Sequence, residues 1–183
     1  MAEPRVLVVL APGAEEMEVA IVVDVLRRAK IGVVLAGLDG VEPVTCSRQL
    51  VIKPDAAFNQ SAGPFDALVL PGGAPGAKRL AESAAVGQLL KDFEHSGRLV
   101  GALCAAPTAL QAHGVFAGRR MTSYPSFHAQ LAAHGAIEQQ RVVQDGNLIT
   151  SQGPGTAFEF ALAIVAKLVG ADRAAQIEGP LLL

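Results

Sequence analysis

The sequence predicts an α/β fold in which helices sandwich a doubly wound, mostly parallel sheet, as a single domain over residues 1–183. Short β-branched runs alternate with longer amphipathic stretches along the whole chain, a pattern typical of a parallel sheet covered on both faces. Several of the short runs are apolar on both faces, as central parallel strands are. No linker, composition break or internal repeat divides the chain.

The first strand and helix have the clearest patterns. Arg5–Ala11 has the sequence RVLVVLA and ends at Pro12. Glu15–Ala29 is predicted to be a helix, with glutamates in its first turn and arginines in its last, the order that complements the helix dipole. Apolar residues cover most of its circumference, so we expect it to be buried in a core or in a subunit interface.

Further strands and helices follow from local signals. Asp145-Gly146 is a strong hairpin signal, Pro107 and Gly114 bound a short helix, and Thr156 with Glu159 predicts a capping box. The predicted elements are strands at Val33–Leu38, Phe65–Leu70 and Leu99–Leu103, a hairpin of Val44–Cys46 and Leu50–Ile52, a second hairpin of Arg141–Gln144 and Leu148–Ser151, and helices from Ser83 to His95, over Ala105–Ala112 and from Thr156 to Val169.

Composition excludes several classes of protein. With 15 basic and 17 acidic residues the net charge is -2, which argues against binding nucleic acid through phosphate neutralisation. An apolar content of 51% excludes disorder, and the low charged content of 17% leaves surface for a partner. No apolar run approaches the ~18 residues that span a bilayer. The N-terminus lacks a signal-peptide pattern, so we predict a cytoplasmic protein.

The two cysteines differ in their sequence context. Two cysteines without a CxxC or a Cys/His cluster predict free thiols and neither structural zinc nor any other metal. Cys104 ends the strand at Leu99–Leu103 and directly precedes the helix at Ala105–Ala112, among small residues, where unpaired amides and the helix dipole favour a thiolate. Cys46 lacks this setting and is interpreted as a packing residue in a strand.

Other candidate groups lie at the carboxyl ends of the strands, where such folds bind ligands. A carboxyl at Glu18 beside a thiolate would be driven toward protonation and could carry protons. Glu15 and Glu16 are interpreted as dipole partners only. The amides of Gly72 and Gly73 could face an oxyanion, or these glycines could simply form a tight turn. The histidines, interpreted as solvated or capping residues, offer no base for a Cys–His hydrolase: His95, His113, His128 and His134.

Five ordered motifs are recognisable together. They are LAPGAEEME at Leu10–Glu18, CSR at Cys46–Arg48, VLPGG at Val69–Gly73, ALCAAPTAL at Ala102–Leu110 and TSQGPGTAFEFALAI at Thr150–Ile164. From about Arg5 to Leu182 the chain resembles the DJ-1 branch of the DJ-1/PfpI superfamily.

The resemblance implies a flavodoxin-like fold, a homodimer and a site without a cofactor. It implies that Cys104 is the nucleophile with Glu18 as its partner, that the amides of Gly73 and Ala105 bind the oxyanion, and that Arg48 reaches the site from the neighbouring subunit. The implied activity is a glutathione-independent glyoxalase and protein deglycase for methylglyoxal, glyoxal and their early adducts, protective in oxidative stress. The alternative is a redox-sensing chaperone whose cysteine is oxidised to sulfinate, with little catalysis. The resemblance also implies that the protein can occur in the nucleus and mitochondria as well as in the cytoplasm.

The sequence departs from the family pattern at three positions. Tyr124 stands where many members have a histidine, which puts a His-assisted proton step in doubt, and is retained as a substrate-binding candidate. Lys53 replaces a cysteine of some members. Ala105 follows the nucleophile where protease-like relatives have histidine, so we do not expect a peptidase.

Overall fold

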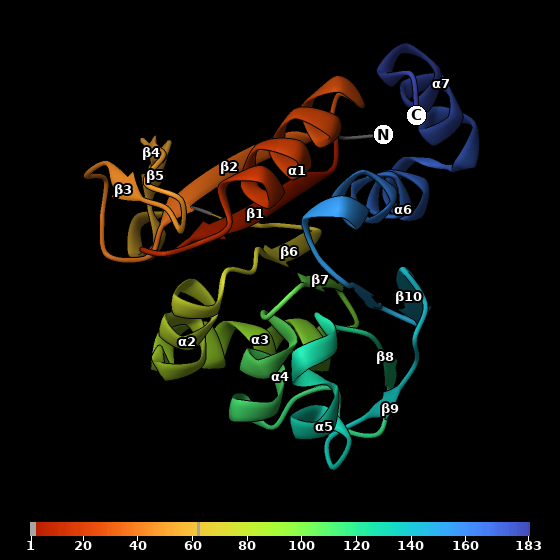
Figure 1. Ribbon diagram of the computed structural model, residues 1–183. Coiled ribbons are helices and arrows are strands. Elements are labelled where there is room, and N and C mark those ends of the chain that lie inside the picture. Colours follow the sequence, from red (N-terminus) through yellow and green to blue (C-terminus); the bar gives the residue numbers. More distant parts are fainter. Residues whose placement is uncertain (1–2, 62) are drawn as a thin grey trace.

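A seven-stranded sheet forms the centre of the molecule, in the computed structural model that describes residues 3–61 and 63–183 (Figure 1). All neighbouring strands are parallel except the last hairpin, β10 with β11. The strand order is β10 (Val142–Asp145), β11 (Leu148–Ser151), β7 (Leu99–Leu103), β6 (Ala67–Leu70), β1 (Arg5–Leu10), β2 (Gly32–Gly37) and β5 (Ala56–Ala57). This confirms the predicted doubly wound α/β sandwich.

Helices cover both faces of this sheet. The described helices are α1 (Glu16–Arg28), α2 (Ala74–Glu82), α3 (Ala84–Ser96), α4 (Pro107–His113), α5 (His128–Leu131), α6 (Ala157–Val169) and α7 (Ala171–Leu181), with short 3-10 turns η1 (Phe58–Gln60), η2 (Pro125–Phe127) and η3 (Pro154–Thr156). Two small ribbons lie beside the sheet, β3 (Val44–Thr45) with β4 (Val51–Ile52) and β8 (Arg120–Met121) with β9 (Ala136–Ile137). In the part of the chain that the structure describes, no helix is long and apolar enough to cross a bilayer.

The alternation of side chains along β1 divides the core into two halves. Val6, Val8 and Leu10 pack with α1, α6 and α7, while Leu7 and Val9 pack with α2, α3 and α4 on the other face. Figure 1 shows the same division, with α1, α6 and α7 on one side of the strands and α2 to α5 on the other. Since both faces are covered, the two-sided apolar run predicted for this strand is explained.

A glycine in β7 brings helix α6 close to the strand that leads to Cys104. A Cβ on Gly101 would lie 2.8 Å from Cζ of Phe160, closer than a real Cβ approaches its neighbours. Phe160 is fully buried there. The Phe160 ring therefore occupies the space next to the strand at Gly101, and a larger residue at position 101 would displace this ring.

The predicted capping box at the start of α6 is wrong. Thr156 makes no side-chain capping bond to the helix, because its hydroxyl accepts from the Gly153 N–H at 3.0 Å and lies 2.6 Å from Ser151 Oγ. The carboxylate of Glu159 instead accepts from Arg141 Nε at 2.7 Å. Both members of the box are thus engaged with the preceding turn and with the last hairpin.

Helix α1 is not buried all round within the chain. It packs Val19, Val22 and Val25 into the core, yet Met17 remains 54% exposed. One face of this helix is therefore buried in the core, and burial of the other face in a subunit interface stays a prediction.

Candidate active site

Cys104 occupies a sharp turn directly after β7. Its backbone has φ of +61°, a left-handed conformation that costs a non-glycine residue on the order of 1–2 kcal/mol. Two hydrogen bonds hold the turn: the Cys104 N–H donates to the Ser151 carbonyl at 2.9 Å, and the Cys104 carbonyl accepts from the Tyr124 N–H at 2.8 Å. The thiol is 9% exposed and opens into a pocket. Its neighbours thus impose a strained backbone on the predicted nucleophile.

The predicted helix after Cys104 begins later than the sequence indicates. Helix α4 starts at Pro107 instead of Ala105, so Cys104 lies in the turn between β7 and α4, and the helix N-terminus is two residues farther from the thiol than predicted. The amide N–H groups of Gly73 and Ala105 face the sulfur instead. Gly73 has φ of +83°, a left-handed conformation that forms the tight turn after β6. The same residue also presents its amide to the sulfur of Cys104.

The side chain of Glu18 lies behind the thiol. Glu18 is fully buried in α1, and its Oε2 accepts from the Gly72 N–H at 2.7 Å. Its Oε1 is also buried and has no hydrogen-bond partner of ordinary geometry among the described residues. A Cβ on Gly72 would lie 2.5 Å from the Cβ of Cys104 and 2.8 Å from Glu18 Oε2. Only glycine at position 72 lets the carboxyl and the thiol approach each other.

Gly72 therefore differs from its predicted role. Its N–H is bonded to Glu18 and the residue does not line the pocket, so it is not available to a substrate oxyanion. The two amides that face the sulfur are those of Gly73 and Ala105. The structure thus assigns Gly72 to holding the carboxyl.

Burial dominates the protonation of this pair. Desolvation raises the pKa of Glu18 from 4.5 to about 7, against the Gly72 N–H and the Cys104 thiol, which favour the carboxylate. Desolvation, followed by the negative charge of Glu18, raises the pKa of Cys104 from 9.0 to about 12, although the amides of Gly73 and Ala105 lower it. The predicted protonation of Glu18 agrees with this direction. The resting thiolate predicted for Cys104 does not, because burial and the adjacent carboxylate outweigh the two amides.

The pocket in front of Cys104 has a volume of about 560 Å³. Its walls include Arg48, Tyr124 and Phe127. Arg48 belongs to the same chain as Cys104, so the neighbouring subunit implied by the resemblance is not needed to bring it there. Tyr124 is 47% exposed and contributes its ring to the wall and its amide to the turn. Of the predicted substrate-binding residues, Arg48, Gly73, Ala105 and Tyr124 therefore line one pocket, and Gly72 does not.

Glu15 and Glu16 do more than complement the helix dipole. The Ser47 hydroxyl lies 2.9 Å from Glu15 Oε2 and 2.8 Å from Glu16 Oε2, and Glu16 Oε1 accepts from the Arg48 N–H at 2.8 Å. These bonds tie the turn after β3 to the start of α1. They fix the backbone from which Arg48 reaches the pocket, a role that sequence spacing did not reveal.

The remaining candidates lie away from this pocket. Cys46 is a free, buried thiol that does not line it, in agreement with its interpretation as a packing residue, although β3 ends one residue before it, at Thr45. Ring nitrogens of His113, His128 and His134 lie within 3.0 Å of backbone carbonyls. Residues 3–61 and 63–183 contain no group of three His, Cys, Asp or Glu side chains that could hold a metal ion.

Comparison with known proteins identifies the family of the chain. Residues 4–167 match the DJ-1/PfpI family. The "Parkinson disease protein 7 homolog" of Danio rerio is 52% identical, over 100% of this chain and 99% of the relative. The "Glutathione-independent glyoxalase DJR-1.2" of Caenorhabditis elegans is 41% identical, over 100% of this chain and 98% of the relative. The crystal structure of Drosophila melanogaster DJ-1beta superposes with a TM-score of 0.98 at 50% identity, covering 100% of this chain and 99% of that one. The chain thus belongs to the DJ-1/PfpI family.

Proposed function

We propose that this protein is a glutathione-independent glyoxalase and protein deglycase that acts on methylglyoxal, glyoxal and their early adducts. The observation that carries the proposal is the buried Glu18 carboxyl beside the Cys104 thiol, with the amides of Gly73 and Ala105 facing the sulfur. A relative with 41% identity carries the name of a glutathione-independent glyoxalase. The cellular role that follows is protection in oxidative stress, in the cytoplasm, where free cysteines stay reduced.

The first step is addition of the thiol to the aldehyde. As Sγ of Cys104 forms a bond to the aldehyde carbon, the S–H becomes more acidic than the free thiol, and its proton moves to the adjacent Glu18 carboxylate. The carbonyl electrons move to oxygen, and the two amides at the sulfur stabilise the oxyanion. Protonation of this oxygen gives a hemithioacetal.

The second step is an internal rearrangement that needs no external oxidant. Glu18, returned to its carboxylate form, takes the proton from the carbon that carries sulfur, giving an enediol, and a proton is then delivered to the neighbouring carbon. One carbon is oxidised and its neighbour reduced, so the product is a thioester of a 2-hydroxy acid. Water adds to the thioester carbonyl and the Cys104 thiol leaves, releasing lactate from methylglyoxal or glycolate from glyoxal.

The pocket also has space for an adduct. Its volume of about 560 Å³ is far larger than a two- or three-carbon dicarbonyl. Attack of the thiol on the carbinolamine carbon of an early adduct would break the C–N bond, and the departing amine would take the proton from Glu18. Arg48 and Tyr124 are then in place to contact the rest of the substrate.

We further propose that the protein is a homodimer. Met17 on α1 is 54% exposed, and Leu50 and Val51 beside β3 are 54% and 57% exposed. Exposed apolar side chains of this size mark interaction surfaces when they cluster. Sedimentation at low micromolar concentration should give the mass of a dimer, and Met17→Glu should give the monomer. A wild-type monomer at that concentration would refute the dimer.

The direct test of the catalytic proposal is conversion of methylglyoxal to lactate without glutathione. Wild type should form lactate, and Cys104→Ser should lose this activity because no thiol remains to form the hemithioacetal. Glu18→Gln should bind the aldehyde and stop before the thioester. Cys46→Ser serves as the matched control and should keep wild-type turnover, since Cys46 lies outside the pocket. Full turnover by Cys104→Ser would refute the covalent mechanism.

A redox-sensing chaperone is the second candidate function, and the difference between the two thiols favours it. Cys104 opens into the pocket while Cys46 does not, and a protonated Glu18 could donate to a sulfinate on Cys104. Mass spectrometry after mild peroxide should then find Cys104 oxidised before Cys46. Equal oxidation of both thiols would contradict this function.

A further inference from the structure

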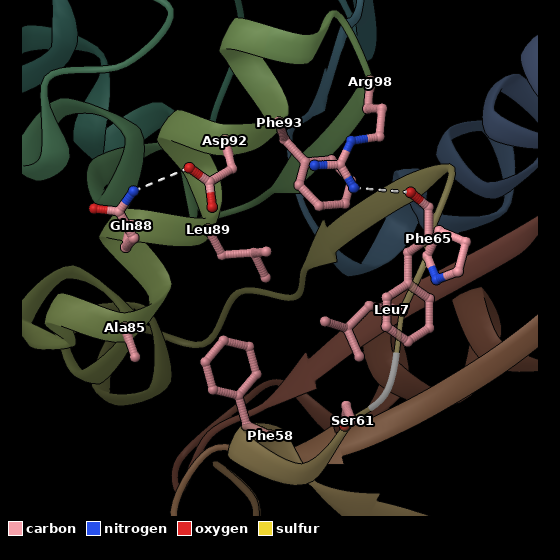
Figure 2. A pocket seen from close by; sticks show the side chains of 12 residues that line it. Leu7, Phe58, Ser61, Phe65, Ala85, Gln88, Leu89, Asp92, Phe93 and Arg98 are labelled. Atoms are coloured by element: carbon pink, nitrogen blue, oxygen red, sulfur yellow. Dashed lines mark hydrogen bonds between the residues drawn. The ribbon is translucent and has the colours of Figure 1, made fainter.

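A second cavity lies at the opposite end of the sheet from Cys104. It has a volume of about 310 Å³ and lies between α3, β1 and the segment that follows β5 (Figure 2). Leu7 and Phe65 line it near the amino ends of β1 and β6, whereas Cys104 follows the carboxyl end of the parallel strand β7. None of its lining residues lines the Cys104 pocket. The two cavities are therefore separate sites.

The interior of this cavity is apolar. Leu7 and Phe65 are buried, Phe58 and Leu89 are partly exposed, and their side chains surround the same space in Figure 2. Cavities of about 300 Å³ with such walls are at the lower end of the range that holds small organic ligands. An apolar body is therefore the part of a ligand that this interior fits.

The rim of the cavity carries one fixed cation, Arg98. Its guanidinium carbon lies 3.8 Å from the centroid of the Phe93 ring, Nε donates to Ser96 Oγ at 2.7 Å, and Nη1 donates to the Phe65 carbonyl at 3.1 Å. These three contacts hold the guanidinium in one orientation, as Figure 2 shows for Phe93 and Phe65. Arg98 forms no ion pair with a described carboxylate, and its Nη2 makes no hydrogen bond there. The outer edge of the guanidinium is free to bind an anion.

The other charged group at the rim is Asp92. Its Oδ1 accepts from Gln88 Nε2 at 2.9 Å, and the two side chains are one helical turn apart on α3. Asp92 is exposed, so solvent and salt screen its charge. A single anionic group can therefore reach Arg98, while a second anionic group on the ligand would approach Asp92.

We propose that this cavity binds a small monocarboxylate with an aromatic or branched apolar body. The carboxylate would pair with the free edge of the Arg98 guanidinium, and the body would lie against Leu7, Phe58 and Leu89. A guanidinium fixed by stacking and hydrogen bonds loses little conformational freedom on binding, and its fork matches a carboxylate. The site is independent of the reaction at Cys104.

The test uses 4-fluorophenylacetate and fluorine NMR on the full chain, with 4-fluorophenylacetamide as the neutral analogue. The acid should bind at millimolar concentrations or below, and the amide about tenfold more weakly, because a charged pair at this rim is replaced by a neutral one. Arg98→Met should weaken the acid about tenfold and leave the amide unchanged. Lys91→Met removes one positive charge from helix α3 outside the cavity and should leave the binding of both ligands unchanged.

Two further measurements separate this proposal from a folding defect and from the Cys104 pocket. Ala85 is exposed at the mouth of the cavity, so Ala85→Trp should fold normally and block both ligands. Protein alkylated at Cys104 should bind the acid as the unmodified protein does. Equal affinity for acid and amide, unchanged binding by Arg98→Met, or loss of binding on alkylation would each overturn the proposal. None of these outcomes depends on whether methylglyoxal is converted to lactate.

Discussion

Replacing Glu18 by glutamine should remove a pH dependence of stability that the wild-type chain carries between pH 4.5 and 7. Glu18 is fully buried, and desolvation raises its pKa from 4.5 to about 7. A carboxyl with a raised pKa binds its proton more tightly in the folded chain than in the unfolded chain. The stabilisation is therefore complete below pH 4.5 and is lost as the pH rises through about 7.

The magnitude follows from the two pKa values. The difference between about 7 and 4.5, at about 1.36 kcal/mol for each pKa unit, corresponds to roughly 3 kcal/mol in the free energy of unfolding. This is a large part of the roughly 5–15 kcal/mol that stabilises an ordinary domain. Glutamine keeps an oxygen for the Gly72 N–H and has no charge to bury, so Glu18→Gln should lack this loss.

The assay is urea unfolding followed by circular dichroism at several pH values between 4.5 and 7.5. Between these limits wild type should lose roughly 3 kcal/mol more unfolding free energy than Glu18→Gln. Glu16→Gln is the matched control with the opposite sign: desolvation opposes it, but hydrogen bonds from its own backbone, Ser47 and Arg48 lower the pKa of Glu16. The ionised Glu16 carboxylate therefore stabilises the folded chain, and this stabilisation is lost on acidification. Glu16→Gln lacks this contribution, so its unfolding free energy should fall less than that of wild type as the pH is lowered. Parallel curves for wild type and Glu18→Gln would refute the assignment of a buried, raised carboxyl.

Three further predictions concern activity and packing. The kcat/KM for methylglyoxal should rise as the pH increases through about 7, because Glu18 must be ionised to take the thiol proton, and a pH-rate profile that is flat from pH 5 to 9 would contradict this. Gly72→Ala places a Cβ 2.5 Å from that of Cys104, so lactate formation should fall about 100-fold, whereas wild-type turnover would show that the close approach is unimportant. Gly101→Ala meets Phe160 at 2.8 Å and should lower the free energy of unfolding by about 1–3 kcal/mol, and an unchanged urea midpoint would rule out tight packing there.

The sheet was predictable because its strands carry their own signals. The two-sided apolar run at Arg5–Ala11 became β1, and Asp145-Gly146 lies at the turn of the β10–β11 hairpin. Helix α2 was missed, because Pro75 and Gly76 in its first turn have the composition of a loop. Proline is tolerated at that position since its missing N–H would have no partner inside the helix. Proline and glycine, which usually indicate the end of a helix, can thus also lie in its first turn.

The proximity of the candidate residues was predictable from the sequence, whereas their protonation was not. Cys104 and Glu18 could be named from their positions after β7 and β1, at the edge of the sheet where ligands bind. The direction of the Cys104 pKa depends on how deeply the thiol is buried and on its distance from a carboxylate of another element. The pocket wall at Phe127 comes from the 3-10 turn η2, whose approach to the site is set by tertiary packing. The spacing of residues in the sequence does not give the burial of the thiol, its distance from the carboxylate or the approach of Phe127.

The left-handed backbone at Cys104 has a consequence for engineering this protein. Glycine adopts φ of +61° without the steric cost that cysteine bears, so Cys104→Gly would relieve strain while removing the proposed nucleophile. If Cys104 is the nucleophile as proposed, selection for heat resistance alone would favour variants without the proposed activity, the conflict between stability and activity seen in strained active sites. A library screened for thermal tolerance should therefore be sorted on dicarbonyl turnover in the same round, or its most robust members would be dead enzymes.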